Sequence, residues 1–133
     1  MVRRPRDSRA GGATLKRKER TDAQKLDDMR AALLRIETLT GELDHDEFLA
    51  NTTVQEAAAF RIMALGDAAG DVSRRTQNAN PSINWRRVSS FRNNPAHEYY
   101  DFKPENLWKF IQDVLPHLES KLRKVRPAPE STS

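Results

Sequence analysis

Hydrophobic residues recur along this chain three and four positions apart, the spacing that places them on one face of an α-helix. One such stripe consists of Leu26, Met29, Leu33, Ile36 and Leu39. Gly41 follows it, and glycine commonly ends helices, so the pattern predicts a helix over residues 22–40. A second stripe consists of Val54, Ala58, Ile62, Leu65, Ala69 and Val72. Thr52 or Thr53, with Glu56 after it, offers a capping box for this second long helix.

Two shorter segments carry different patterns. Residues 44–51 place Asp44 before the apolar pair Phe48 and Leu49, which predicts one capped helical turn packed by these two side chains. The run from Thr76 to Ser82 contains two asparagines and a proline, a composition that predicts a loop.

Two further helices are predicted in the second half of the chain. Ser82 or Asn84 begins the first, and Trp85, Val88, Phe91 and Arg92 share one side of it. Pro95 should end it, because the residue before a proline avoids the α conformation. Lys103-Pro104-Glu105 opens the second, whose apolar face is Leu107, Phe110 or Ile111, Val114, Leu118 and Leu122. Pro116 should kink this helix rather than end it, since the stripe resumes beyond the proline.

The chain contains no stretch of alternating apolar and polar residues long enough to predict a strand. The fold class predicted is therefore all-α, an antiparallel bundle of four to five helices. The second long helix is rich in alanine, with Gly66 and Gly70 among the alanines. Such a face permits close approach of another helix, so we expect a second copy to pack there in a two-fold dimer.

Composition narrows the classes of function. The 133 residues suit one domain, and with no cysteine the chain has no disulfide, thiol nucleophile or thiolate metal site. It also lacks the glycine-rich motifs that bind dinucleotides or nucleotide phosphates, and no apolar run approaches the roughly 20 residues of a membrane span. We expect a cytoplasmic protein without a membrane segment.

The positive charge lies at the two ends of the chain. Residues 1–20 carry eight lysines and arginines against two acids, and residues 121–133 carry four against one. The part between them is acidic, so the net charge of +4 does not predict a uniformly basic folded surface. We expect a basic disordered arm at 1–20, a helical domain at 21–123 and a disordered tail at 124–133.

One segment, residues 91–102, gathers an arginine, a histidine, two asparagines, acids and two tyrosines at a helix break. Arg92 offers a rigid fork of donors for a phosphate, and His97 can exchange a proton near neutral pH. Together they supply the acid–base groups and the positive charge that 2′-OH attack on an RNA phosphodiester requires, without a metal. The residue types alone favour a structural explanation, in which Arg92 pairs with Glu98 or Asp101 and His97 caps a turn.

The spacing of this segment resembles a known ribonuclease motif. Arg92, four residues, His97, one residue and Tyr99 is similar to the motif of HEPN domains, specifically the HepT toxins paired with a MntA-type minimal nucleotidyltransferase antitoxin. Three other runs resemble that family in order and spacing, namely 62–69, 81–85 and 107–118. The resemblance covers about residues 22–120.

The resemblance implies a HEPN-like domain acting as a metal-independent endoribonuclease toxin, without a cofactor. It implies that Arg92 holds the scissile phosphate, His97 acts as general base or acid, and Asn93 orients the phosphate or Arg92. Tyr99 is implied as the hydroxyl that the antitoxin modifies with AMP, with Tyr100 as a competing acceptor. RNA, the nucleotidyltransferase and a second copy of the chain are the implied partners.

Two other functions stay open at this point. One is a non-catalytic HEPN-fold binding module or regulatory partner of a nucleotidyltransferase. The other is a nucleic-acid-binding protein that acts through its basic ends. Among the remaining candidates, His45 is interpreted as part of a solvated turn, His117 as a helix-face residue, and Trp85 and Trp108 as core anchors. Four arginines, Arg74, Arg75, Arg86 and Arg87, are candidates for phosphate contacts near the motif.

Overall fold

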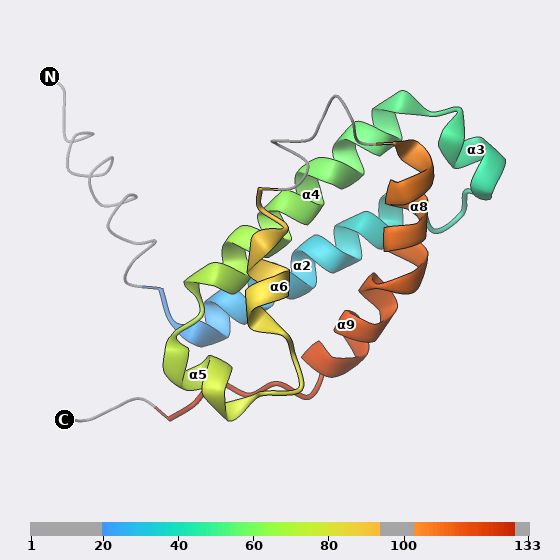
Figure 1. The fold of residues 1–133 in the computed structure, drawn as a ribbon. Helices are drawn as coiled ribbons and strands as arrows, with labels where there is room; N and C mark the ends of the chain where they lie inside the picture. Colours follow the sequence, from blue (N-terminus) through green and yellow to red (C-terminus); the bar gives the residue numbers. More distant parts are fainter. Residues whose placement is uncertain (1–19, 94–102, 130–133) are drawn as a thin grey trace, which may run out of the picture.

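Two long antiparallel helices, α2 (Asp22–Thr40) and α4 (Thr52–Asp71), form the centre of the fold (Figure 1). The start of α2 lies beside the end of α4, where the Lys25 ammonium donates to the Asp71 carbonyl at 2.9 Å. The computed structural model describes residues 20–93 and 103–129, and every regular element within these ranges is a helix. The prediction of an all-α bundle is confirmed.

Helix α2 begins and ends where its sequence pattern predicts. Thr21 and Gln24 form a reciprocal capping box that satisfies two backbone donors of the first turn. Leu26, Met29 and Ile36 are at most 1% exposed, so the predicted apolar stripe faces the core. The N–H of Gly41 closes the last turn on the Glu37 carbonyl.

Helix α4 has the predicted stripe but a different cap. The side chain of Asn51 accepts a hydrogen bond from the Val54 N–H, so the cap is Asn51 and not Thr52 or Thr53. Both threonines are exposed residues of the first helical turn. The choice is local: the Asn51 N–H bonds to the Phe48 carbonyl three residues earlier, which orients Asn51 at the helix entrance.

The short helix α3 (His45–Leu49) closes the connection between α2 and α4. Asp44 caps it in a box with Glu47, as the acid before the apolar pair predicts. Phe48 is fully buried and its ring lies 5.2 Å from the Trp108 ring, which anchors the turn to α8 (Pro104–Asp113). The predicted helical turn is confirmed.

A helix, α5 (Arg74–Ala79), occupies most of the segment predicted as a loop from Thr76. Ser73 caps it, and the Asp22 carboxylate accepts hydrogen bonds of 2.5 Å from the hydroxyls of Ser73 and Thr76. Burial by itself raises the pKa of Asp22, but these hydrogen bonds outweigh burial and hold the pKa below its ordinary value. The loop prediction was wrong because this carboxylate, distant in sequence, stabilises the first turn of α5.

Helix α6 (Trp85–Ser90) begins after Asn84, whose side chain accepts from the Arg87 N–H. The Asn84 start is one of the two predicted. The helix ends at Ser90, before the predicted stop at Pro95, and residues 91–93 form turns. Pro95 lies outside the described residues.

Helices α8 and α9 (Leu115–Leu122) run along the other side of α2 (Figure 1). Pro104 occupies the first turn of α8, as predicted. In place of the predicted kink, the helix is interrupted at Val114, which separates α8 from α9. The Val114 backbone is itself helical: its N–H donates to the Phe110 carbonyl, and its carbonyl accepts from the Leu118 N–H. The break precedes Pro116 because proline has no N–H to continue the α ladder.

The chain after α9 packs back on the bundle beside α5 (Figure 1). Val125 is 2% exposed, the Asn80 amide donates to the Arg126 carbonyl, and the Ala128 N–H donates to the Thr76 hydroxyl at 2.9 Å. The packed part of the chain therefore extends beyond residue 123, where we placed the end of the domain. Val125 is the buried apolar residue of this segment. Basic residues flank it in the sequence, so the sequence pattern did not indicate its burial.

Candidate functional site

Arg92 and Asn93 lie in the turns that follow α6, and both are exposed. The Arg92 N–H bonds to the Ser89 carbonyl at 3.4 Å, and the Asn93 N–H bonds to the Ser90 carbonyl at 3.0 Å. These bonds continue the helical path for one turn, so both side chains leave a backbone that α6 orients. Within the described residues, no hydrogen bond or ion pair joins the Arg92 guanidinium to another side chain. No described carboxylate therefore occupies its donors.

The residue before Arg92 fixes this turn to the core. Phe91 is 3% exposed, and its ring meets the Phe110 ring edge-on at 4.9 Å and 86°. Val88, one turn earlier, is also buried. Arg92 is thus an exposed side chain on a backbone held by buried neighbours, the combination that a pre-positioned binding group needs.

Two glycines of α4, Gly66 and Gly70, leave space for Arg92. A Cβ placed on Gly66 would lie 2.4 Å from the Arg92 backbone nitrogen and 3.0 Å from the Phe91 Cβ. A Cβ on Gly70, one turn later, would lie 2.9 Å from Nη1 of Arg92. The sequence suggested only that these glycines admit another helix, and the structure shows that they admit the α6 turn and Arg92. The i, i+4 spacing of two glycines was the signal available in the sequence.

The other predicted members of the motif, His97 and Tyr99, lie outside the described residues, as does Tyr100. The described chain resumes at Lys103, which caps α8. Of the candidate catalytic and positioning residues, the structure therefore places Arg92 and Asn93 alone.

Two exposed arginines lie on α6, just before the turn that carries Arg92. Arg86 and Arg87 are exposed on α6, and Arg87 lines a groove of about 190 Å³ between α6 and α9. His117 and Lys121 of α9 line the same groove, and Phe91 forms part of its wall. Arg74 and Arg75 instead lie on α5, where Arg75 donates to the Pro129 carbonyl. The structure thus separates the four candidate arginines into a pair beside Phe91 and a pair on another helix.

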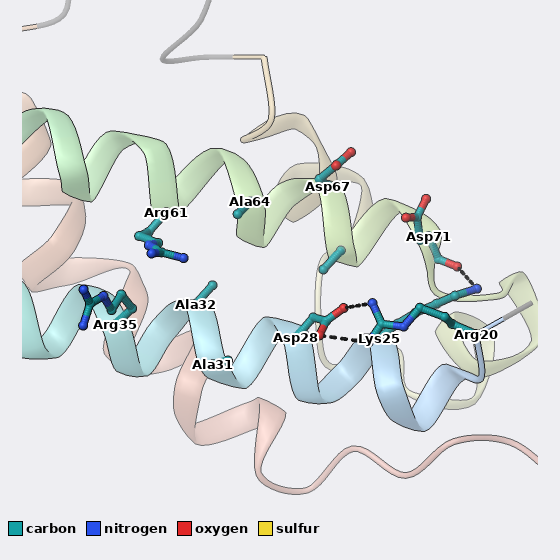
Figure 2. Close-up of a pocket in the computed structure, with 11 residues that line it drawn as sticks. Arg20, Lys25, Asp28, Ala31, Ala32, Arg35, Arg61, Ala64, Asp67 and Asp71 are labelled. Atoms are coloured by element: carbon teal, nitrogen blue, oxygen red, sulfur yellow. Dashed lines mark hydrogen bonds and ion pairs between the residues drawn. The ribbon is translucent and has the colours of Figure 1, made fainter. Parts of the chain in front are cut away.

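A second groove, of about 650 Å³, runs between α2 and α4 (Figure 2). Ala32 and Ala64 face each other across it, while Arg35 and Arg61 lie together toward one end (Figure 2). An ion pair of 2.6 Å between Arg20 and Asp28 lies at its other end. The groove is lined by small side chains at its centre and charged ones at its ends.

Several alanines of α4 pack within the protein, whereas we expected the alanine-rich face to contact a second copy. Ala58 and Ala69 are fully buried within the protein's own core, where they let α2 approach α4 closely. Ala64 and Ala68 line the groove between these helices. Two of these four alanines, Ala58 and Ala69, are therefore part of the protein's own core.

The remaining candidates are two tryptophans and two histidines. Trp85 is 7% exposed and Trp108 packs against the core, so both are anchors as predicted. His117 is an exposed residue of α9, also as predicted. His45 lies in the partly exposed short helix α3, where its Nε2 lies 2.8 Å from a Glu105 carboxylate oxygen and its ring lies 5.7 Å from Trp108. This contact joins α3 to the first turn of α8.

Within residues 20–93 and 103–129, no three His, Asp or Glu side chains gather closely enough to hold a metal ion. None of the helices described there is both long and apolar enough to cross a membrane.

Comparison with known proteins relates the described helices to a family. The chain is 27% identical over 108 residues to a protein of Thermococcus cleftensis named "Probable ribonuclease HepT", covering 81% of this chain and 98% of that protein. It is 22% identical over 86 residues to a protein of Methanocaldococcus jannaschii whose name describes it as a candidate RNase, covering 65% and 79%. No solved structure gives a significant match. The model of the family described as "Ribonuclease HepT-like" matches residues 29–125, most of the bundle and the turn that carries Arg92, and the chain therefore belongs to the HepT-like ribonuclease family.

Proposed function

We propose that the protein is a metal-independent endoribonuclease, the toxin of a toxin–antitoxin pair, which a nucleotidyltransferase antitoxin silences by attaching AMP to Tyr99. The observation that carries the ribonuclease part is Arg92, an exposed guanidinium without a carboxylate partner among the described residues, on a turn anchored by Phe91. A planar fork of donors in that position is suited to a phosphate. Membership of the HepT-like ribonuclease family supports RNA as the source of that phosphate.

The proposed chemistry needs only groups that this chain contains. His97 takes the proton from a ribose 2′-OH, the 2′-oxygen forms a bond to phosphorus, and the bond from phosphorus to the 5′-oxygen breaks. The His97 imidazolium returns this proton to the leaving 5′-oxygen, and the products are a 2′,3′-cyclic phosphate and a 5′-hydroxyl. Arg92 stabilises the charge that develops on the phosphorane, and Asn93 orients the phosphate or Arg92.

Two chains are proposed to pair so that Arg92 and His97 of each line one cleft. Exposed apolar side chains on the two central helices support this pairing, since Leu34 on α2 is 64% exposed and Phe60 on α4 is 59% exposed. Large apolar side chains at such exposure are typical of surfaces that bind another chain. The groove of Figure 2 runs between the same two helices.

The ribonuclease proposal is tested by the products of cleavage. The purified protein, incubated with single-stranded RNA and EDTA, should produce fragments that end in a 2′,3′-cyclic phosphate or a 3′-phosphate, because no step uses a metal. Mass spectrometry of the fragments measures these ends, and RNA with 2′-O-methyl riboses should stay intact. Cleavage that stops in EDTA would contradict the mechanism. Binding of RNA without cleavage would favour a non-catalytic HEPN-fold module.

The regulatory proposal is tested at Tyr99. In the modification, the phenol oxygen attacks the α-phosphorus of ATP and pyrophosphate leaves, so the mass rises by one AMP. The bulky anion lies two residues from His97, where it would repel RNA, and the modified protein should be inactive. Tyr99→Phe keeps the ring without the acceptor oxygen, so it should retain cleavage and escape modification.

Tyr100→Phe is the matched control for Tyr99→Phe. After incubation with the antitoxin and ATP, intact-mass measurement should find one added AMP on the parent and on Tyr100→Phe, and none on Tyr99→Phe. Equal addition to the parent and Tyr99→Phe would show that another residue is the acceptor.

A further inference from the structure

Gly70 of α4 lies against the side chain of Arg92. A Cβ at this position would be 2.9 Å from Nη1 and 3.8 Å from Cζ of Arg92, and 3.5 Å from the Cβ of Ser89. Only the distance to Nη1 is shorter than an ordinary van der Waals contact. The added Cβ would therefore collide with the guanidinium and not with backbone atoms. Arg92 occupies the space that the missing side chain leaves open.

Nothing in the local backbone requires glycine at residue 70. It lies inside α4, one residue before the helix ends, and its φ is outside the left-handed region that favours glycine. It is exposed, so packing of α2 against α4 does not exclude a methyl group there. Glycine weakens a helix relative to alanine, and the neighbour that an alanine would meet is Arg92.

We propose that Gly70 is a positioning residue for Arg92, setting where the guanidinium lies above the last turn of α4. This inference rests on the proposed function, in which Arg92 holds the scissile phosphate. A guanidinium binds phosphate through donors in a fixed plane, so its placement decides how many of them reach the phosphate oxygens. A displacement of about 1 Å is enough to impair a reaction that depends on alignment.

Gly66 provides a contrast within the same helix. Its absent Cβ leaves room for the backbone nitrogen of Arg92 and for Phe91, which cannot move without moving the α6 turn. The end of an exposed arginine side chain can move. Substitution at Gly70 should therefore displace the guanidinium and leave the fold intact.

The test is Gly70→Ala, with Ala57→Ser as the control that adds one heavy atom to α4 outside the lining of the groove of Figure 2. The melting temperature of Gly70→Ala should equal or exceed that of the parent, because alanine favours the helix. Its affinity for uncleavable 2′-O-methyl RNA should fall about fivefold or more, as expected when a charged hydrogen bond is weakened. Ala57→Ser should bind as the parent does.

A double-mutant cycle links the effect to Arg92. Lysine has no branched guanidinium to meet the new Cβ, so Gly70→Ala should change RNA affinity less than twofold when Arg92 is already replaced by lysine. An equal loss of affinity in both backgrounds would overturn the proposal, because the methyl group would then act elsewhere.

A second readout does not depend on RNA. The ¹⁵N NMR signal of the Arg92 Nε–H group, assigned by its loss in Arg92→Lys, should shift in Gly70→Ala and stay in place in Ala57→Ser. A parent that neither binds nor cleaves RNA would refute the proposed function, and this signal would still test the positioning. An unmoved Arg92 signal in Gly70→Ala would overturn the inference.

Discussion

Arg92→Ala is expected to lower RNA cleavage by roughly 10²–10³-fold, the loss typical when one group that stabilises transition-state charge is removed. The guanidinium is exposed and makes no ion pair with a described side chain, so its removal leaves no buried charge behind. The melting temperature should therefore stay within about 1–2 °C of the parent, since a surface change is worth only a few tenths of a kcal/mol. Initial rates on a fluorescent RNA and thermal unfolding measure the two quantities.

His97→Ala should reduce the rate to a similar degree, about 10²–10⁴-fold, because proton transfer loses its donor and acceptor. Two matched controls use residues of the same type elsewhere in the fold. Arg123→Ala removes an exposed arginine directly after α9, and His117→Ala removes an exposed histidine of α9. Both controls should cleave within a few-fold of the parent. If Arg92→Ala and His97→Ala cut RNA as fast as these controls, the proposed catalytic site is wrong.

Gly66→Ala is expected to destabilise the bundle and, through the same clash, to disrupt the candidate site at Arg92. The new Cβ would meet the Arg92 nitrogen at 2.4 Å and Phe91 at 3.0 Å, atoms held by the packing of α6 on α4. Overpacking of this kind costs about 1–3 kcal/mol, and the helix preference for alanine returns at most about 1 kcal/mol. Gly66→Val adds two more carbons and should cost more.

The measurement is the free energy of unfolding in urea, with the melting temperature falling roughly 4 °C for each kcal/mol lost. Gly70→Ala is the matched control, since it makes the same chemical change one turn later on the same helix and should not lower stability. A Gly66→Ala protein as stable as the parent would show that the α6 turn can move away from α4. The position of Arg92 would then not be set by this contact.

Much of the bundle could be read from periodicity, because the stripes that face the core are local properties of each segment. The stripe from Leu26 to Leu39 predicted α2, and Lys103-Pro104-Glu105 predicted the start of α8. The loop prediction after Thr76 failed because that segment depends on a distant partner. Helix α5 needs Asp22, which lies 51 residues before Ser73, and the same carboxylate reaches Thr76.

The candidate site was predicted in part. Residue types and spacing singled out Arg92 and Asn93, and the structure places both exposed at the end of α6. It does not describe His97 or Tyr99, so their roles stay predictions. The relation of Gly66 and Gly70 to Arg92 was not predictable, because a glycine in sequence does not indicate which neighbour fills the space above it.

The sequence by itself determined the all-α class, the main helices and the residues that carry the proposed chemistry, since helical period and side-chain chemistry are properties of the chain alone. Only the tertiary structure decided that α5 replaces the predicted loop, that Val125 joins the core, and that α4 leaves room for Arg92 at Gly66 and Gly70. Each of these depends on atoms that folding brings together from separate parts of the chain. Residue type and helical period belong to the chain itself, whereas the position of a residue in space is set by such contacts.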